Sequence, residues 1–402
     1  MSLLLDQGAG APPFDSADNR IDRLTYKHDS DPLDICFIGT YPPTLCGVAT
    51  FGASLRNAIA SPLGGVIRVL DEPEPTRSPE VMVEWFTGDR TSKNKALAAM
   101  RSFDVAILQH EFGIYGGEDG EEVIGFLRDS PIPVIMVLHT VLSDPSPHQR
   151  QVFERAIEAA DMLVTMTDAA RRRVVDRHGV DPARVAVVPH GAHPNIVGGR
   201  MVRRPEPVVL TWGLIGPGKG LEYGVEAMAS LVDLDPAPVY VIAGQTHPKV
   251  RLAQGGRYRG WLQQRAQDIG VSDRVIFEDR YLDPASLRSL IRSADLVLLP
   301  YKSRDQICSG VLAEAVAAGK PIVASAFPHA IEQLSSACGI VVPHEDPAAI
   351  ARALRRLMTD RPLADSMRNS AMREAQRLAW PNVGREYLRL AHGLRAGRES
   401  VR

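Results

Sequence analysis

The chain contains two series of continuous apolar runs separated by helical segments, and this alternation limits its fold more than any other feature. Runs that are apolar on both faces are typical of parallel strands, which helices cover from both sides. Amphipathic segments at 48–60, 121–129 and 147–160 separate runs of the first series. These runs lie at 34–39, 105–110, 133–140, 162–167 and 185–191. The first half therefore predicts a doubly wound parallel α/β sheet.

A polar stretch rich in Pro, Gly and Arg at 192–207 interrupts the pattern, which then starts again. The runs of the second series lie at 208–212, 239–244, 274–280, 295–300, 321–325 and 339–343. Each half opens with a strand, a turn rich in Gly and Pro, and a helix. A chain of 402 residues is also too long for one ordinary core, so we expect two α/β domains.

The expected organisation has four parts. Residues 1–32 form a flexible tail, 33–196 a first Rossmann-like domain, and 205–380 a second one. A closing helix over 381–396 packs back on the first domain. In such sheets ligands bind at the carboxyl ends of the strands, and two facing domains leave a cleft between them.

The composition, 45% hydrophobic and 23% charged, is that of a soluble globular protein. Four widely spaced cysteines form no CxxC pair, which argues against a disulfide framework or a zinc cage. The N-terminus lacks the basic region of a signal peptide, and no apolar stretch approaches the ~20 residues that span a bilayer. We therefore expect a cytoplasmic protein without a transmembrane segment.

The formal net charge of −2 conceals an asymmetry, with −9 over residues 1–196 and +7 over the remainder. A basic second half suits an anionic ligand such as a nucleoside diphosphate, although scattered surface charge gives the same numbers. The sequence pI near 6.6 and the lack of an aromatic and basic stripe argue against nucleic-acid binding.

Two glycine-containing turns follow the opening strands of the two halves. In "GTYPPTLCGVATF" (39–51), Gly47 precedes a helix, and in "WGLIGPGKGLE" (212–222), Gly218 and Lys219 do so. Glycine lets helix N–H groups approach an anion, and a lysine adds positive charge there. The second turn matches neither a P-loop nor a dinucleotide fingerprint. A tight structural turn with a solvated lysine is the alternative.

Polar residues also follow two strands of the first half. His110 and Glu111 open the loop "HEFGIYGGEDGEE", where residue 114 is Ile, so the HExxH zinc motif is not matched. We predict that this pair recognises hydroxyl groups of an acceptor. His139 comes directly after an apolar run. It either faces the cleft or is a hydrogen-bonded core residue.

The segment "SRDQICSGVLAEAVAAGKPIVAS" (303–325) places a helix start directly after a strand. Ser309 and Gly310 can leave the first helix N–H groups free for a diphosphate. Glu314 lies about one turn further, where its carboxylate could accept hydrogen bonds from a ribose diol. A capped helix with a surface glutamate is the alternative if the segment is taken alone.

Taken together, these segments resemble glycosyltransferase family 4, whose members have the GT-B fold of two Rossmann-like domains facing across a cleft. The resemblance covers about residues 34–395 and is most specific over 295–346. It implies that Glu314 holds the nucleotide ribose as the second glutamate of the E-x7-E motif. It further implies that Lys219 neutralises the diphosphate and that His139 faces the donor sugar. Backbone groups that meet the donor are implied at Gly47, Gly218, Ser309, Gly310, Val311 and Leu312.

The sequence departs from the family pattern at two positions. The first glutamate of E-x7-E is Gln306, which keeps hydrogen-bonding capacity without charge. The arginine expected after Gly213 is Leu214, and the loss of a bidentate phosphate partner could cost a few kcal/mol without a substitute. We consider Arg280, at the end of 274–280, as a candidate substitute.

The resemblance implies a retaining, metal-independent transfer of a hexosyl unit from a UDP- or GDP-sugar. His139, Lys219, Gln306 and Glu314 are the expected catalytic residues. No cofactor is expected, and no DxD metal site is found, because Asp233 and Asp235 lie in a loop beside prolines. The alternatives are a GT-B phosphorylase that acts on a disaccharide or glycoside with inorganic phosphate, and a non-catalytic module that binds a sugar or a partner.

The expected partners are a nucleotide-sugar donor and a carbohydrate or lipid-linked acceptor, with a function in polysaccharide biosynthesis. A peripheral contact with the inner face of a membrane stays open, because 169–177 and 353–361 are basic and partly apolar. A small-molecule acceptor, and a monomer or a homodimer, are equally compatible with the sequence.

Overall fold

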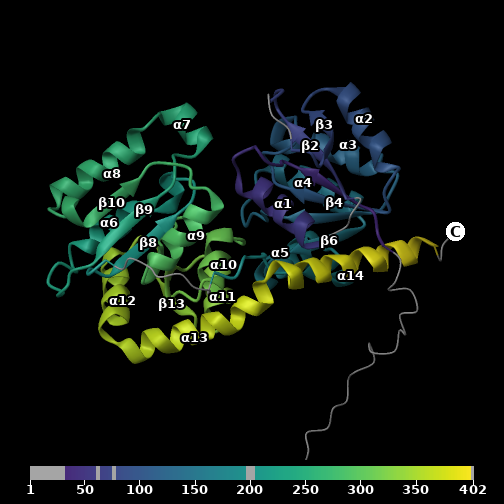
Figure 1. Ribbon diagram of the computed structural model, residues 1–402. Coiled ribbons are helices and arrows are strands. Elements are labelled where there is room, and N and C mark those ends of the chain that lie inside the picture. The colour runs from purple at the N-terminus through teal and green to yellow at the C-terminus, as the bar shows by residue number, and fades with distance from the viewer. Residues whose placement is uncertain (1–31, 60–63, 75–77, 196–203, 400–402) are drawn as a thin grey trace, which may run out of the picture. The chain divides into compact units, whose positions relative to one another are not determined.

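The computed structural model describes residues 32–59, 64–74, 78–195 and 204–399 (Figure 1). The predicted tail over 1–32 therefore lies outside the described residues, apart from Pro32. Residues 196–203, half of the polar link at 192–207, lie outside them as well. Among the described residues, no helix is both long enough and apolar enough to span a membrane.

The first half forms a seven-stranded parallel sheet in the order β3-β2-β1-β4-β5-β6-β7. Its strands are β1 (Ile35–Gly39), β2 (Gly65–Leu70), β3 (Val81–Phe86), β4 (Val105–His110), β5 (Val134–Leu138), β6 (Met162–Thr165) and β7 (Val185–Val187). Its helices are α1 (Gly47–Ile59), α2 (Arg90–Met100), α3 (Glu122–Arg128), α4 (Pro147–Ala159) and α5 (Asp168–His178).

The second half forms a six-stranded parallel sheet in the order β10-β9-β8-β11-β12-β13. Its strands are β8 (Val208–Trp212), β9 (Val239–Ala243), β10 (Val275–Glu278), β11 (Leu296–Leu299), β12 (Ile322–Ser325) and β13 (Gly339–Val342). Its helices are α6 (Leu221–Met228), α7 (Pro248–Gln254), α8 (Arg257–Asp268), α9 (Pro284–Ser293), α10 (Gly310–Ala317), α11 (Pro328–Leu334), α12 (Pro347–Thr359), α13 (Arg361–Leu378) and α14 (Trp380–Glu399).

The predicted fold class of two doubly wound parallel sheets is confirmed. The central strands β1, β4, β5, β8, β9, β11 and β12 are buried over their whole length. The chain reverses its direction of winding between β1 and β4, and again between β8 and β11. These are the two switch points at which sheets of this kind bind ligands, at the carboxyl ends of the strands.

Strands β2 and β3 and helix α2 are absent from the runs recognised in the sequence. Strand β2 carries Arg68, whose charge interrupts the apolar pattern although the side chain is fully buried. Its Nε donates to the carbonyl of Tyr41 at 3.1 Å, and its guanidinium pairs with Glu74. Arg68 therefore supports the turn between β1 and α1 from inside the sheet.

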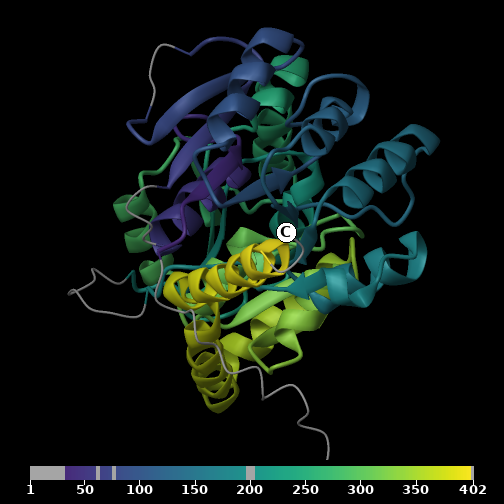
Figure 2. The same cartoon turned by 90° about the vertical axis from the view of Figure 1, so that its right-hand side faces the viewer.

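The closing helix α14 runs over Trp380–Glu399, beyond the predicted 381–396, and lies against α1 of the first half (Figures 1 and 2). Trp380 packs edge-on against Phe51 of α1, with 5.3 Å between the ring centroids. Tyr387 and Val383 extend this contact into a shared apolar cluster. The apolar face of α14 thus contributes to the core beneath the first sheet.

Candidate functional site

The turn after β8 packs tightly on the segment that follows β11. A Cβ atom at Gly220, whose φ is 58°, would lie 2.1 Å from the carbonyl oxygen of Pro300. The N–H of Lys302 donates to the carbonyl of Gly218 at 3.0 Å. This packing places the Lys219 Nζ over the face of Tyr301, 4.0 Å from the ring centroid. Lys219 therefore lies at the switch point of the second sheet.

The start of α10 keeps two amide N–H groups for a ligand. Ser309 caps the helix, with its Oγ accepting from the N–H of Leu312 at 3.3 Å. The Ser309 N–H donates to Nδ1 of the buried His329 at 2.8 Å. The prediction that the amides of Ser309 and Leu312 meet a donor is therefore wrong. Within the described part of the chain, the N–H groups of Gly310 and Val311 have no partner.

Glu314 lies one turn into α10 and faces the end of β8. The indole Nε1 of Trp212 donates to its Oε2 at 3.0 Å. Burial raises the pKa of the Glu314 carboxyl, and the bond from Trp212 partly opposes this rise. A Cβ atom at Gly213 would lie 3.6 Å from the side chain of Val311, so the turn and the helix start are adjacent. Glu314 therefore belongs to the same site as the β8 turn.

Gln306 supports the loop before α10. The side-chain N–H of Gln306 donates to the backbone carbonyl of Cys308. The backbone carbonyl of Gln306 accepts from the backbone N–H of His329 at 3.2 Å. A glutamate at this position could not donate the first of these bonds. The departure from the family pattern at Gln306 thus fixes the loop that presents Gly310.

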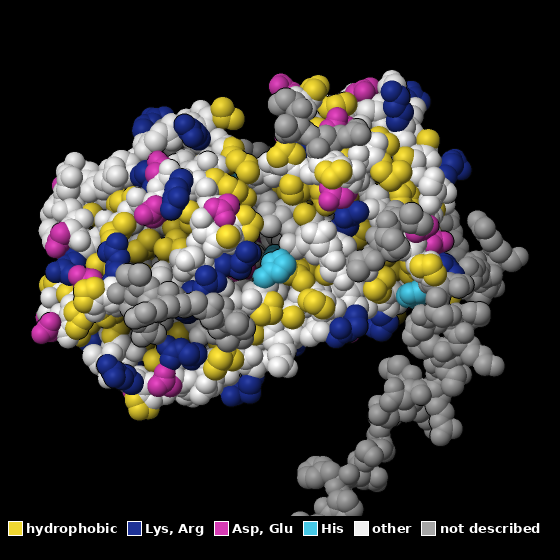
Figure 3. All heavy atoms as spheres, in the orientation of Figure 1, with side chains coloured by type: hydrophobic (Ala, Val, Ile, Leu, Met, Phe, Trp, Pro, Cys, Tyr) yellow, Lys and Arg dark blue, Asp and Glu magenta, His cyan; other side chains and the backbone are white. Residues whose placement is uncertain are grey.

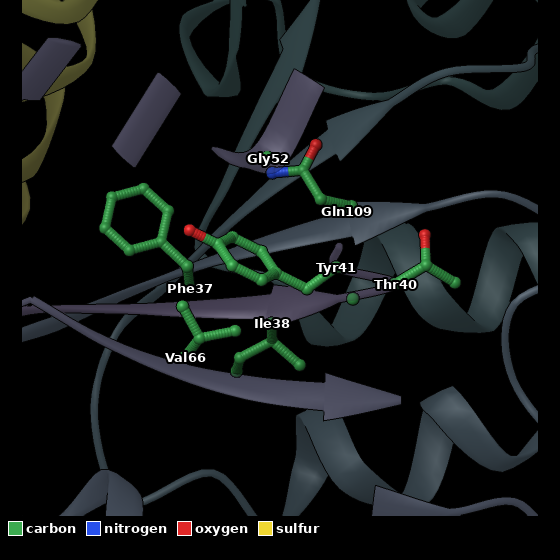
Figure 4. Close-up of a pocket in the computed structure, with 8 residues that line it drawn as sticks. Phe37, Ile38, Thr40, Tyr41, Gly52, Val66 and Gln109 are labelled. Atoms are coloured by element: carbon green, nitrogen blue, oxygen red, sulfur yellow. The ribbon is translucent and has the colours of Figure 1, made fainter. Parts of the chain in front are cut away.

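His139 and Gln109 lie side by side at the carboxyl ends of β5 and β4. His139 Nε2 is 2.7 Å from Gln109 Oε1, and the imidazole packs edge-on against Phe51, 5.0 Å between ring centroids. Burial lowers the pKa of His139 to about 3, with smaller contributions from neighbouring histidines. Gln109 also borders a small pocket beside Thr40 and Tyr41 (Figure 4). A neutral His139 therefore acts as a hydrogen-bonding group.

Gly47 forms the first residue of α1 and is exposed. A Cβ atom there would meet nothing within 4 Å, so space is open at this helix start. Phe51, one turn further, packs against His139. The start of α1 thus lies close to His139, as the predicted role of Gly47 requires.

His110 does not join His139. Successive residues of a strand point to opposite faces of the sheet, and Gln109 shares its face with His139. His110 is 1% exposed on the other face, edge-on to Phe112 and Phe153. Burial lowers its pKa to about 4. The structure therefore makes His110 a core residue and corrects its prediction as an acceptor residue.

Glu111 remains close to the site. Its Oε2 accepts from Thr140 Oγ1 at 2.5 Å, and its Oε1 accepts from the N–H of Phe112 at 3.1 Å. Burial raises the pKa of Cys308 to about 12, and the negative charge of Glu111 contributes to this rise. Glu111 is thus near the loop that precedes α10.

His190 is a site residue that the sequence reasoning missed. A Cβ atom at Gly310 would lie 3.0 Å from His190 Nε2, so the imidazole contacts the start of α10. Its Nδ1 is 2.7 Å from the carbonyl oxygen of Gly191, which assigns the proton to Nδ1 and leaves Nε2 as an acceptor. The signal was available, because His190 lies near the end of the run at 185–191, after the apolar residues.

Several bonds join the two halves around this site. Thr167 Oγ1 donates to the carbonyl of Ile307 at 3.2 Å. Asp305 accepts from Ser143 at 2.7 Å and from Arg173 at 3.1 Å. The loop before α10 is therefore held directly by the first half of the chain.

A second link involves the start of α5. Glu332 of α11 accepts from the N–H groups of Asp168 and Ala169 at 2.8 and 2.9 Å. A carboxylate at a helix start satisfies free N–H groups and interacts favourably with the helix dipole. No local sequence pattern indicates this pairing, because the partners are more than 160 residues apart.

Arg280, which was predicted to bind the donor, lies apart from these contacts, as do the two aspartates that the sequence analysis did not assign to a metal site. Arg280 has a 66% exposed side chain and pairs with Glu278 at 3.4 Å, and the structure gives it no contact with Lys219 or α10. Asp233 pairs with Arg355 at 2.6 Å, and Asp235 precedes Pro236 in the same loop, so neither is held toward a metal. The charges on the face shown in Figure 3 are mixed in sign.

One group of side chains in the first half has the composition of a metal site. Ligand atoms of Glu118, Asp119 and His148 lie within 4.8 Å of one another. His148 Nδ1 is 3.0 Å from Asp119 Oδ2, and this bond raises the pKa of His148. The group is largely exposed, and mutual hydrogen bonds account for its geometry.

Replacing Gly244 by alanine should destabilise the second half, because the φ of Gly244 is 128° and a Cβ atom would lie 2.0 Å from the carbonyl oxygen of Gly213. We expect a loss of about 2 to 4 kcal/mol in the free energy of unfolding, measured by urea titration. Gly260→Ala is the matched control. Gly260 lies in the exposed interior of α8 with open space around it, and its replacement should stabilise by about 0.5 to 1 kcal/mol. Equal effects of the two changes would contradict the close approach.

Two family models match the chain. The model for glycosyl transferases group 1 matches residues 201–374, and the model for glycosyltransferase family 4 matches residues 73–195. The structure of Anabaena Alr3699/HepE in complex with UDP has a TM-score of 0.72 and 15% identity, covering 90% of this chain and 100% of that one.

Two similar relatives are D-inositol 3-phosphate glycosyltransferases. That of Salinispora tropica is 29% identical over 296 residues, which are 64% of this chain and 58% of the relative. That of Salinispora arenicola is 28% identical over 366 residues, which are 82% of this chain and 75% of the relative. The match therefore spans less than two thirds of the length of the first relative.

Two parallel α/β sheets, with a lysine and a helix start at the switch point of the second, have the arrangement of the GT-B fold. Residues 73–195 match the model for glycosyltransferase family 4, and residues 201–374 match that for glycosyl transferases group 1. The resemblance predicted from the sequence is confirmed.

Proposed function

We propose that the protein is a retaining, metal-independent glycosyltransferase, which transfers a hexosyl unit from a nucleoside-diphosphate sugar to a carbohydrate, lipid-linked or small-molecule acceptor. The observation that carries the proposal is the convergence of three groups at the switch point of the second sheet. These groups are the Lys219 ammonium, the N–H groups of Gly310 and Val311, and the carboxylate of Glu314.

The first two groups meet the main demand of the reaction. When the bond between sugar and phosphate breaks, negative charge develops on the departing diphosphate and positive charge on the sugar ring. A lysine and amide dipoles that are already oriented stabilise the diphosphate without reorganisation. They supply in this way the charge that a metal ion supplies elsewhere, so no cofactor is required.

Glu314 gives the site its preference for a ribonucleotide. Its Oε2 is held by Trp212, which leaves Oε1 for a ribose diol. The carboxylate lies one turn beyond the amides of Gly310 and Val311. A nucleotide whose diphosphate binds these amides would therefore place its ribose near Glu314.

The first half supplies groups that orient the sugar and the acceptor. Neutral His190 lies beside the start of α10, where the donor sugar would extend from the diphosphate. Neutral His139 packs against Phe51, which also contacts His190. Glu111 and Thr140, which follow strands β4 and β5 of the first half, are hydrogen-bonded to each other. In a front-face reaction the leaving phosphate oxygen takes the acceptor proton, so none of these residues has to act as a base.

The structure of the Anabaena protein supports a UDP-sugar as donor, and a GDP-sugar is the alternative that the family resemblance leaves open. The Anabaena structure holds UDP, and both Salinispora relatives are named for an inositol phosphate acceptor. We propose the same donor class for this chain. Phosphorylated polyols and lipid-linked sugars are the first acceptors to test.

The test is a calorimetric titration with UDP, GDP, ADP and TDP, followed by transfer assays with the matching sugars. At a nucleotide concentration 100 times its dissociation constant, binding should stabilise the protein by about 2.7 kcal/mol. NMR of the product should show the anomeric configuration of the donor. Binding of none of the four nucleotides would overturn the proposal, and release of sugar phosphate from a disaccharide would indicate a phosphorylase.

The role of Glu314 has its own measurement. We expect the wild-type protein to bind a 2′-deoxynucleoside diphosphate about 10-fold more weakly than the ribonucleotide, because one hydrogen bond to a charged group is lost. In Glu314→Gln this difference should shrink to about twofold. Glu374→Gln, on the surface of α13, is the matched control and should keep the full difference. An unchanged preference in Glu314→Gln would show that the ribose binds elsewhere.

A further inference from the structure

Arg259 is a buried arginine at the carboxyl ends of β9 and β10. It belongs to α8, and only 8% of its side chain is exposed. Its Nη2 donates to the carbonyl of Gly244, directly after β9, at 2.5 Å. The same atom is 2.9 Å from Oδ1 of Asp279, directly after β10. The guanidinium is therefore anchored at one edge, beside the switch point of the second sheet.

The remaining donors of this guanidinium are unsatisfied. Nε and Nη1 are buried and have no hydrogen-bond partner among the described residues. Asp279 balances the charge weakly, because 60% of its side chain is exposed to water. Buried polar groups in native proteins are almost always paired, so two unpaired N–H groups on one buried cation indicate an absent anionic partner.

The guanidinium lies next to the turn that binds the donor. A Cβ atom at Gly244 would lie 2.0 Å from the carbonyl oxygen of Gly213, so the residue that Arg259 holds touches the peptide before Leu214. The N–H of Ile215 donates to the carbonyl of Gln245 at 2.9 Å. Position 214 is where the family pattern places an arginine and this chain has leucine.

We infer that Arg259 binds the diphosphate of the nucleotide donor through Nε and Nη1, and that it takes over the task of the arginine missing at position 214. The planar fork of a guanidinium matches two phosphate oxygens. This inference rests on the proposed function. Nε and Nη1 are buried, so the residues that cover them have to shift when the donor binds. The neighbouring segment that follows β9 pairs with the β8 turn through Ile215 and Thr246.

The experiment compares Arg259→Gln, Arg259→Lys and the wild type by calorimetric titration. The ligands are UDP, GDP, ADP and TDP, each beside its free nucleoside. We expect Arg259→Gln to lose at least 10-fold in affinity for the diphosphate that the wild type binds, and less than twofold for the nucleoside. Arg259→Lys keeps a charge without the fork and should show a smaller loss of the same kind. Arg265→Gln, on the same helix and paired with Glu226 on the surface, should bind both ligands like the wild type.

A rescue variant separates binding from structural support. Leu214→Arg in the Arg259→Lys background should recover most of the lost diphosphate affinity, since it returns a guanidinium to the neighbouring turn. Equal losses for nucleoside and diphosphate, or unchanged affinity for both, would overturn the inference while the proposed function stands. If the wild type binds no nucleoside diphosphate, the inference and the proposed function both fail. If Arg259→Gln does not fold, the Lys variant and its rescue decide.

Discussion

Replacing Lys219 by methionine should lower the kcat of glycosyl transfer by about 100- to 1,000-fold, because oriented positive charge at the leaving group acts mainly in the transition state. Methionine keeps the length of the side chain over Tyr301, so the turn after β8 should remain folded. The measurement is the release of the nucleoside diphosphate under saturating donor. The KM for the donor should change less than kcat, because the charge on the departing diphosphate is larger in the transition state.

Lys95→Met controls for the loss of one positive charge from the protein. Lys95 is exposed on α2 of the first half, and no predicted site residue contacts it. Its replacement should leave both kcat and KM within about twofold of the wild type. A loss of kcat in Lys219→Met smaller than about 10-fold would show that another group carries the charge of the leaving diphosphate.

Much of the fold could be predicted because buried parallel strands are apolar on both faces. Strand β4 has the predicted bounds, β12 and β13 differ from theirs by one residue at one end, and β11 differs by one residue at each end. Strand β2 was missed because the charge of Arg68 interrupts its apolar run, although pairing with Glu74 allows this side chain to be buried. The link near 194–206 lies largely outside the described residues, so that boundary stays a prediction.

Lys219 and Glu314 could be located from the sequence, because they lie in the turn after one strand and in the helix after another, and their roles stay predictions. The orientation of His110 was also predictable, because it alternates with Gln109 along β4. Which N–H groups at the start of α10 are already hydrogen-bonded within the chain could not be predicted. This depends on His329, which lies 20 residues further along the chain and takes the Ser309 N–H. Arg259 was missed for the same reason, since only the fold shows that two of its donors are unpaired.

Mild acid should unfold the protein well above the pH at which most carboxylates become protonated. Burial lowers the pKa of His110 to about 4 and, aided by His190 and Arg377, that of His329 to about 3. In the unfolded chain each imidazole takes up a proton near pH 6.5. Between pH 6.5 and about 4, therefore, the unfolded state binds more protons, and the free energy of unfolding falls as pH falls.

The size of this effect is comparable to the whole stability of a domain. Each fully buried histidine contributes up to about 1.4 kcal/mol per pH unit, and about half of that at pH 6.5 itself, so the pair should cost about 3 kcal/mol between pH 6.5 and pH 5. His139 and His190, whose pKa values are lowered to about 3 and about 4, act in the same direction. Glu314 acts in the opposite direction, because its pKa is raised, but it is a single group.

Two substitutions remove the titrating imidazoles of His110 and His329 and keep the packing around them. His110→Phe keeps an aromatic ring between Phe112 and Phe153 and eliminates a buried Nδ1 that has no partner among the described residues. In His329→Asn the side-chain oxygen replaces Nδ1 as the acceptor for the Ser309 N–H. Urea titrations at pH 7.5, 6.5, 5.5 and 5.0 should show a shallower loss of stability in each variant, by up to about 1.4 kcal/mol per pH unit. A pH dependence identical to that of the wild type in both variants would mean that these imidazoles are already protonated in the folded protein, or that other groups govern its acid stability.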